Sequence, residues 1–161
     1  MVLNIRILCV GHLKEAFWKD AVKEYEKRLS RYARVEVMEV PDEKAPEALS
    51  PAQAAQVKAR EGERLLKLVR EKDHLIALDV KGARMDSETF ANHLRSLALA
   101  GRSGVCLLIG GSLGLSEEVL NRADLRLSFS DMTFSHQLMR PILMEQLYRA
   151  FKIISGETYH K

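Results

Sequence analysis

Residues 127–140, L-S-F-S-D-M-T-F-S-H-Q-L-M-R, lead from an apolar run through a polar loop into the last helical segment of the chain. The loop is rich in hydroxyl groups, which come from Ser128, Ser130, Thr133 and Ser135. A loop of this kind between two apolar elements can bind a small polar ligand through its main chain. Serine, threonine and aspartate are also ordinary residues of turns and helix starts. Taken alone, the stretch is compatible both with a ligand loop and with a capped turn.

Apolar runs typical of strands alternate with helical periodicity on both sides of this loop and along the whole chain. Trp18, Val22, Tyr25 and Leu29, for example, recur at helical spacing and predict one buried stripe. Five strands are expected at residues 3–10, 35–40, 74–80, 105–109 and 125–129, and five helices at residues 14–31, 52–70, 86–101, from 116, and at 136–155. This alternation predicts an α/β fold, a single-domain parallel-type sheet flanked by helices.

The composition is that of one globular domain. A chain of 161 residues, 47% of them hydrophobic, can bury a core without disulfides. No apolar run approaches the roughly 20 residues of a transmembrane helix, and the amino terminus lacks the features of a signal peptide, so we expect a cytoplasmic protein with no membrane partner. Cys9 and Cys106 lie in apolar runs without metal-ligand spacing, which indicates core thiols and no metal site. The net charge of +3 is too small to identify a nucleic-acid-binding protein.

A glycine-rich segment, I-G-G-S-L-G-L from Ile109, follows the fourth expected strand. Glycine lets a backbone approach a ligand closely, but the segment has neither the G-x-G-x-x-G pattern nor the lysine of a P-loop. It does match G-x-S-x-G with Ser112 as nucleophile, so a small serine hydrolase is the enzymatic alternative. Two features count against that alternative: Ser116 has the position of the helix cap, and no oxyanion segment lies upstream.

Three loops, which follow Leu78, Ile109 and Phe129, leave the last three expected strands. Ligands of open α/β sheets bind at the carboxyl ends of the strands. If these strands are neighbours in the sheet, the three loops form one pocket.

The last expected helix is apolar on more than one side, because Met139, Met144 and Phe151 leave little of its surface polar. Such a helix needs more than one packing partner, either inside the fold or in a second subunit. The chain then closes with G-E-T-Y-H-K from Gly156. A terminus is normally frayed, but an aromatic ring, an imidazole and a cation together can stack on a base and contact phosphate.

Several motifs together resemble one family. The segment from Ile109, residues 127–140, E-Q-L-Y-R-A-F-K-I from Glu145 and the closing Y-H-K are similar to the ribosomal RNA large-subunit methyltransferase H family, a minimal member of the SPOUT superfamily. V-G-H-L-K-E from Val10 and E-V-P-D-E-K-A-P-E from Glu39 agree with it in the amino-terminal half. The resemblance covers essentially the whole chain, residues 1–161, as one domain.

The resemblance implies a SPOUT fold with a deep trefoil knot in its carboxyl-terminal part, roughly residues 74–161. It implies a homodimer that uses S-adenosylmethionine to methylate N3 of a pseudouridine in the large-subunit rRNA of the assembled ribosome. The cofactor-binding residues that it implies are Leu78, Gly110, Gly111, Phe129, Ser130, Asp131, Met132, Thr133 and Phe134. A non-catalytic ribosome-binding factor is the alternative outside enzymes.

Methyl transfer mainly requires that the two reacting atoms are aligned. Because N3–H is a weak acid, a base or a group that stabilises the developing anion should help. The candidates are His136, Arg140, Tyr148, Arg149, Tyr159 and His160, and Arg149 and Lys161 are also candidate RNA-binding residues. Since the tail is short, it can complete the site of the other subunit.

Ser135 departs from the family, which usually has proline just before the histidine. Proline would fix φ and remove an N–H at the mouth of the loop. Serine keeps a donor and adds conformational freedom, so we expect the change to affect cofactor affinity rather than the fold.

Overall fold

One five-stranded parallel sheet, in the order β2-β1-β4-β3-β5, forms the centre of the computed structural model, which describes residues 2–161. The strands are β1 (Asn4–Val10), β2 (Arg34–Val40), β3 (His74–Arg84), β4 (Gly104–Ile109) and β5 (Leu125–Ser128). β1 and β4 are buried almost throughout, as expected for parallel strands that are covered on both faces. The predicted α/β fold with a parallel sheet is confirmed.

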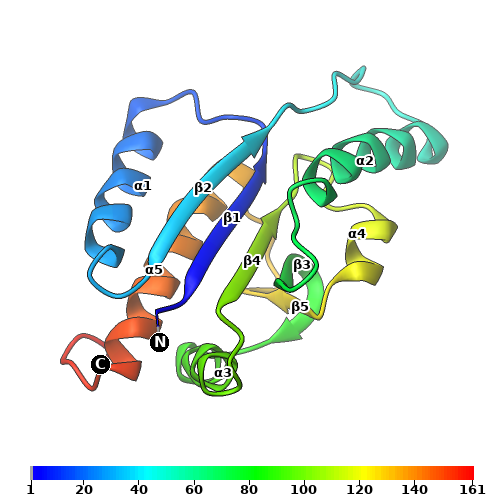
Figure 1. Ribbon diagram of the computed structural model, residues 1–161. Helices are drawn as coiled ribbons and strands as arrows, with labels where there is room; N and C mark the ends of the chain where they lie inside the picture. Colours follow the sequence, from blue (N-terminus) through cyan, green and yellow to red (C-terminus); the bar gives the residue numbers. More distant parts are fainter. Residues whose placement is uncertain (1) are drawn as a thin grey trace.

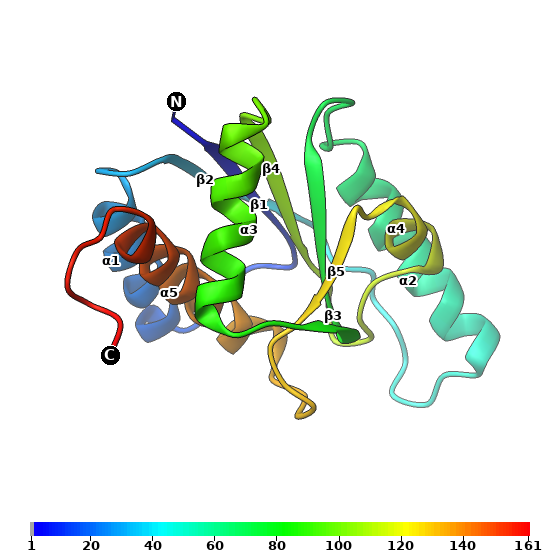
Figure 2. The same cartoon turned by 90° about the horizontal axis from the view of Figure 1, so that it is seen from below.

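Five helices cover the two faces of this sheet (Figure 1). α1 (Ala16–Leu29), α3 (Ser87–Leu99) and α5 (His136–Ile154) lie on one face, and α2 (Pro51–Leu66) and α4 (Glu117–Arg122) lie on the other. Figure 2 shows the two helical layers on either side of the strands. The sheet therefore separates two cores.

Alternate side chains of the inner strand β1 enter the two cores. Ile5 and Ile7 pack toward α1, α3 and α5, whereas Leu8 and Val10 pack toward α2 and α4. This division follows from the two-residue period of a strand. Burial of each such side chain contributes about 1.5–3 kcal/mol, so the position of β1 fixes the register of both layers.

α2 begins with a capping box. The Ser50 hydroxyl accepts a hydrogen bond from the Gln53 N–H at 3.2 Å, and the Gln53 side chain accepts one from the Ser50 N–H at 2.9 Å. The helix ends at Leu66, before the predicted end at residue 70, because the chain tightens into a turn there. In that turn the Leu68 carbonyl accepts a hydrogen bond of 2.7 Å from the buried Arg6 guanidinium.

Gly62, in the middle of α2, lies against α4. A Cβ at this position would come within 2.5 Å of the Ser116 hydroxyl oxygen and 3.1 Å of a Val119 methyl group. Glycine weakens a helix by about 1 kcal/mol relative to alanine. Here it permits the two helices to approach closely, which explains its place in a helix.

β3 continues beyond the predicted stop at Lys81-Gly82 and ends at Arg84. It pairs with β5 twice, because Leu78 and then Ala83 both lie opposite Leu127, with an irregular segment between them. A Cβ on Gly82 would lie 2.6 Å from the backbone of Arg126. The prediction of a stop was wrong because glycine here allows close strand approach rather than breaking the strand.

α5 lies between α1 and α3 and against the sheet, with Leu143, Leu147 and Phe151 buried. The several apolar sides of this helix therefore find partners within the fold. None of the helices in residues 2–161 combines the length and the apolar character that crossing a bilayer would need.

Candidate functional site

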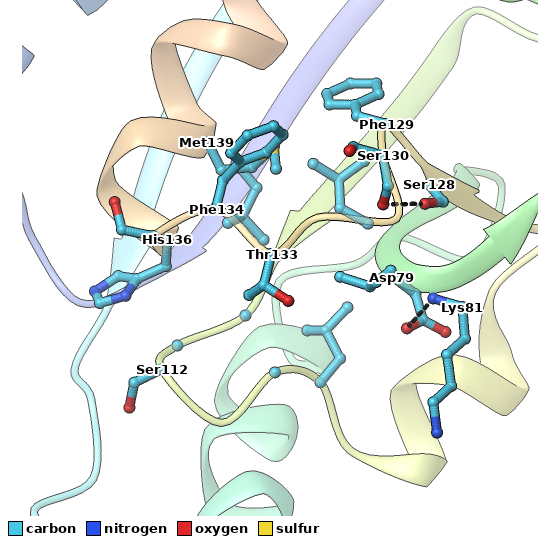
Figure 3. Close-up of a pocket in the computed structure, with 18 of the residues that line it drawn as sticks. Asp79, Lys81, Ser112, Ser128, Phe129, Ser130, Thr133, Phe134, His136 and Met139 are labelled. Atoms are coloured by element: carbon cyan, nitrogen blue, oxygen red, sulfur yellow. Dashed lines mark hydrogen bonds between the residues drawn. The ribbon is translucent and has the colours of Figure 1, made fainter. Parts of the chain in front are cut away.

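A cleft of about 650 Å³ lies at the carboxyl ends of β3, β4 and β5 (Figure 3). These strands are neighbours in the sheet, so the loops that follow them meet at one edge, as predicted from the sequence. The volume is in the range of small-molecule sites. The lining residues are 78–81, 109–115, 127–130, 132–136 and Met139.

The glycine loop after β4 is folded back on itself beside the cleft. The Gly114 N–H donates a hydrogen bond of 3.0 Å to the Gly111 carbonyl, and Gly114 has a φ of 87°. A Cβ on Gly110 would lie 2.6 Å from the carbonyl carbon of Gly114. Only glycine at position 110 permits this tight loop, which brings main-chain atoms to the cleft surface.

The loop from β5 to α5 is held by hydroxyl groups. The Ser128 hydroxyl donates to the Ser130 carbonyl at 3.0 Å, and the Ser130 hydroxyl accepts from the Met132 N–H at 2.9 Å. Ser135 caps α5, since its hydroxyl accepts a hydrogen bond of 3.2 Å from the Leu138 N–H. The two readings of this loop, capped turn and ligand loop, are therefore compatible in the folded chain.

His136 lies at the start of α5 and lines the cleft. Burial lowers its pKa, and the positive charge of Arg140 lowers it further, whereas Asp42 acts in the opposite direction. The imidazole is therefore held in its neutral form at pH 7, in which one ring nitrogen can accept a proton.

Asp79 and Lys81 belong to the irregular segment of β3 and place a negative and a positive side chain at the cleft (Figure 3). The Asp79 carboxylate accepts a hydrogen bond of 3.2 Å from the Lys81 N–H. The sequence predicted that the loop after Leu78 borders the pocket, but it assigned no role to these two side chains. The signal that could have identified them is their position directly after the buried part of a parallel strand, where ligands of α/β sheets bind.

A family model described as "Predicted SPOUT methyltransferase" matches residues 3–160. The chain belongs to the SPOUT methyltransferase family. The chain is also 54% identical over 159 residues to a protein of Lactobacillus delbrueckii subsp. bulgaricus named "Ribosomal RNA large subunit methyltransferase H". That alignment covers 99% of this chain and 100% of the relative. The two findings together confirm the resemblance found in the sequence.

Further relatives agree. A protein with the same name from Alkaliphilus oremlandii is 55% identical over 99% of this chain and 100% of its own length. A solved structure titled as a probable methyltransferase from Bordetella pertussis Tohama I superposes with a TM-score of 0.57 at 12% identity, over 92% of this chain and 95% of that one. This last likeness shows a shared fold and no more.

Most of the predicted cofactor-binding residues of this SPOUT methyltransferase come together in the cleft. Eight of them line it, namely Leu78, Gly110, Gly111, Phe129, Ser130, Met132, Thr133 and Phe134. Asp131 does not, because its exposed carboxylate pairs with Arg84. Met132 is 74% exposed at the edge of the loop.

Arg140 lies one turn beyond His136 but does not line the cleft. Its guanidinium is 3% exposed and donates to the carbonyls of Val10 at 3.4 Å and Gly11 at 2.7 Å, and it forms an ion pair with Glu39. These contacts join α5 to the ends of β1 and β2. In this SPOUT methyltransferase, Arg140 is therefore placed to hold the helix that carries His136.

The tail packs on α5 of the same chain. Tyr159 donates a hydrogen bond of 3.2 Å to Glu145, and the Arg149 guanidinium lies 4.8 Å from the centre of the Tyr159 ring. Arg149 also contacts His160 Nδ1 at 3.1 Å. His160 lines a second cavity that shares Leu127, Phe129 and Phe134 with the cleft, whereas Lys161 lines neither.

Ser112, the nucleophile of the hydrolase alternative, is exposed at the cleft. Within residues 2–161 its hydroxyl has no hydrogen bond to a histidine. Asp124 and Asp131, two carboxylates that follow it in the sequence, contact His74 and Arg84 instead. A serine activated by a histidine and an acid is therefore not assembled here.

Proposed function

We propose that this SPOUT methyltransferase transfers a methyl group from S-adenosylmethionine to N3 of a pseudouridine in the large-subunit rRNA of the assembled ribosome. The observation that carries this proposal is the cleft at the carboxyl ends of β3, β4 and β5, lined by eight of the nine residues that the family pattern assigns to the cofactor. The whole-length relatives named ribosomal RNA large subunit methyltransferase H support the choice of RNA substrate.

The residues of the cleft fit S-adenosylmethionine. Gly110 and Gly111 line the cleft without side chains, so main-chain atoms can contact a ligand there. Phe129 and Phe134 supply aromatic faces for adenine, and Thr133 supplies a hydroxyl for polar groups. The bound cofactor supplies an electrophilic methyl group on a sulfonium. These residues would hold it and exclude water from the reacting atoms.

In the reaction a bond forms between N3 and the methyl carbon, the bond from that carbon to sulfur breaks, and N3 loses its proton. His136 is suited to accept the proton, because burial favours its neutral form and it lines the cleft. Arg140 acts on this step through the position of α5. Tyr159 and His160 in the tail of one subunit complete the site of the other subunit. Arg149 and Lys161 contact phosphate groups of the RNA.

A homodimer is part of the proposal. An apolar groove between α1 and α5 fits a second copy, because Phe17 on its rim is 60% exposed although it is a large aromatic residue. The groove is lined by Phe17, Trp18, Ala21, Tyr25, Leu138, Pro141, Ile142 and Glu145. Since α5 also carries His136, a partner at this groove would lie close to the cleft. The trefoil knot over residues 74–161 stays a prediction.

Labelled S-adenosylmethionine, offered with intact ribosomes that lack the methyl group or with naked rRNA, tests the proposal. We expect label on the ribosomes only, and its loss when residues 159–161 are deleted while calorimetry still detects cofactor binding. Ser112→Ala is the matched control and should transfer methyl like the wild type. Absence of cofactor binding at millimolar concentration would overturn the proposal, and binding of ribosomes without transfer would favour a non-catalytic factor.

A further inference from the structure

A separate cavity of about 590 Å³ lies at the amino-terminal edge of the sheet. The start of β1 and the turns before β3 and β4 build it, and Figure 2 shows these three segments at the same edge. The lining residues are Asn4, Arg6, 70–73 and 101–104. β4, which runs from this edge to the cleft, has six residues, so about 20 Å separates the two sites.

Two tight turns place cationic side chains around this cavity. In the first, Asp73 accepts a hydrogen bond of 2.9 Å from the Arg70 N–H and Asp73 N–H donates to the Arg70 carbonyl at 3.1 Å. In the second, Gly101 has a φ of 79° and the Arg102 N–H donates to the Leu97 carbonyl at 2.8 Å. The turns thereby fix the backbone of Arg70, Lys72 and Arg102, whose side chains remain exposed.

The net positive charge of this cavity lies at its mouth, because the charges of the two residues inside it cancel. Inside, Arg6 and Asp73 form a buried ion pair of 3.2 Å, and Arg6 Nε is buried without a hydrogen-bond partner in residues 2–161. At the mouth, Arg70, Lys72 and Arg102 form no ion pair within residues 2–161. Glu71 is the one further carboxylate among the lining residues. Three cations against one anion give the mouth a net charge of +2.

The chemistry of the lining identifies the kind of ligand. Among its residues there is no aliphatic or aromatic side chain, whereas protein interfaces have an apolar core and base recognition uses stacking surfaces. Arg and Lys with the Ser103 hydroxyl and the Asn4 amide are instead the donors that contact phosphate oxygens. The lining therefore suits the phosphodiester backbone of a nucleic acid.

We propose that this cavity binds the phosphate backbone of rRNA, as a second contact on the ribosome about 20 Å from the methyl-transfer cleft. The identity of the RNA rests on the proposed function, but the phosphate chemistry rests on the cavity alone. Contact at two edges of the sheet would let a chain with a net charge of only +3 recognise the shape of an assembled particle.

The test is a triple variant, Arg70→Ala with Lys72→Ala and Arg102→Ala, which leaves the buried Arg6–Asp73 pair intact. The matched control removes three exposed or half-exposed cations elsewhere, through Lys23→Ala, Lys58→Ala and Arg122→Ala. Ribosome binding by sedimentation and binding of a duplex RNA oligonucleotide by fluorescence anisotropy are measured between 50 and 200 mM salt, roughly the range in which phosphate contacts respond most clearly. Calorimetry with S-adenosylmethionine reports on the cleft separately.

We expect the cavity variant to bind ribosomes and RNA at least tenfold more weakly, with a salt dependence reduced by about two to three counterions, and to bind cofactor as the wild type does. Equal RNA affinity and salt slope for cavity and control variants would overturn the inference. A second result would also overturn it: the wild type binds inorganic phosphate at millimolar concentration, the cavity variant does not, and the two proteins bind RNA equally well. The site would then hold a small anion and not the RNA backbone. A third result would separate the two proposals. If the wild type transfers no methyl group but its ribosome binding still depends on the cavity, the proposed function is contradicted and this inference stands.

Discussion

The Arg140 guanidinium, one turn into α5, donates a hydrogen bond of 2.7 Å to the carbonyl oxygen of Gly11, just beyond β1. This contact ties the helix that begins at the cleft to the end of the inner strand β1. The guanidinium also pairs with Glu39 at the end of β2. Arg140 thus acts as a positioning residue for the amino-terminal end of α5.

Arg140→Leu should lower the free energy of unfolding by about 2–3 kcal/mol, because charge-assisted hydrogen bonds from a buried guanidinium are lost. Denaturant unfolding measures the change. Arg95→Leu, at an exposed site on α3, should leave the midpoint almost unchanged. A variant of Arg140 that is as stable as the wild type but transfers no methyl would show a direct catalytic role instead.

Gly110→Ala should lower the affinity for S-adenosylmethionine at least tenfold. The added Cβ would meet the Gly114 carbonyl carbon at 2.6 Å, so the backbone of the glycine loop that lines the cleft must shift. Isothermal titration calorimetry measures the affinity, and circular dichroism checks the fold. Ser112→Ala, in the same loop but exposed, serves as the control, and equal affinity for both variants would contradict the assigned role of Gly110.

Gly62→Ala should destabilise the protein although alanine is the better helix former by about 1 kcal/mol. The reason is the Ser116 hydroxyl oxygen, which lies 2.5 Å from the added Cβ. Combining it with Ser116→Gly should recover part of the loss, since glycine is tolerated as a helix cap at a cost of only a few tenths of a kcal/mol. Thermal unfolding of the two single variants and the double variant tests this coupling, and simple additivity would exclude it.

Acid should destabilise the fold through the half-buried pair His74 and His93. Their Nε2 atoms lie 3.1 Å apart at the base of β3 and on α3, and burial lowers the pKa of each ring. At acid pH the unfolded chain therefore binds more protons than the folded chain. The contribution of the two rings to the free energy of unfolding should be complete above about pH 6.5 and should fall as the pH drops below that value. The double variant His74→Gln with His93→Gln should flatten this fall in denaturant titrations at several pH values, whereas His12→Gln, at an exposed site, should not. A fall of equal size in the double variant would assign it to other groups, such as His136.

The cysteines are expected to be unreactive in the folded chain. Burial raises the pKa of the Cys9 and Cys106 thiols to about 12 each, so the thiolate that reacts is scarce at neutral pH. Modification by a thiol-specific disulfide reagent should proceed only as fast as the protein opens, and should become rapid in denaturant. Fast modification of native protein would show that one of these strands is accessible.

The parts of the fold that could be predicted from the sequence are those with local signals. The alternation of strands and helices, the Ser116 cap and the meeting of three loops at one edge all follow from periodicity and from the general topology of parallel sheets. The continuation of β3 past Gly82 could not be predicted, because its cause is the backbone of Arg126, which is distant in the sequence.

The site shows the same division. Residues of the loops after β4 and β5 line the cleft because consecutive loop residues share one location, so the family motifs could assign them. Arg140 could not be assigned this way, because its role depends on the Val10 and Gly11 carbonyls that lie beneath the helix. Asp131 likewise differs from its neighbours because Arg84 of another strand attracts it away from the cleft.

The place of α5 between α1 and α3 has a consequence for the synthesis of this protein. Leu143, Leu147 and Phe151 complete the core over one whole face of the sheet. Until these residues have been translated, the nascent chain must expose Ile7 and Leu107 of its central strands to solvent. Premature termination before α5 should therefore yield chains that chaperones retain or proteases remove, rather than a smaller working enzyme.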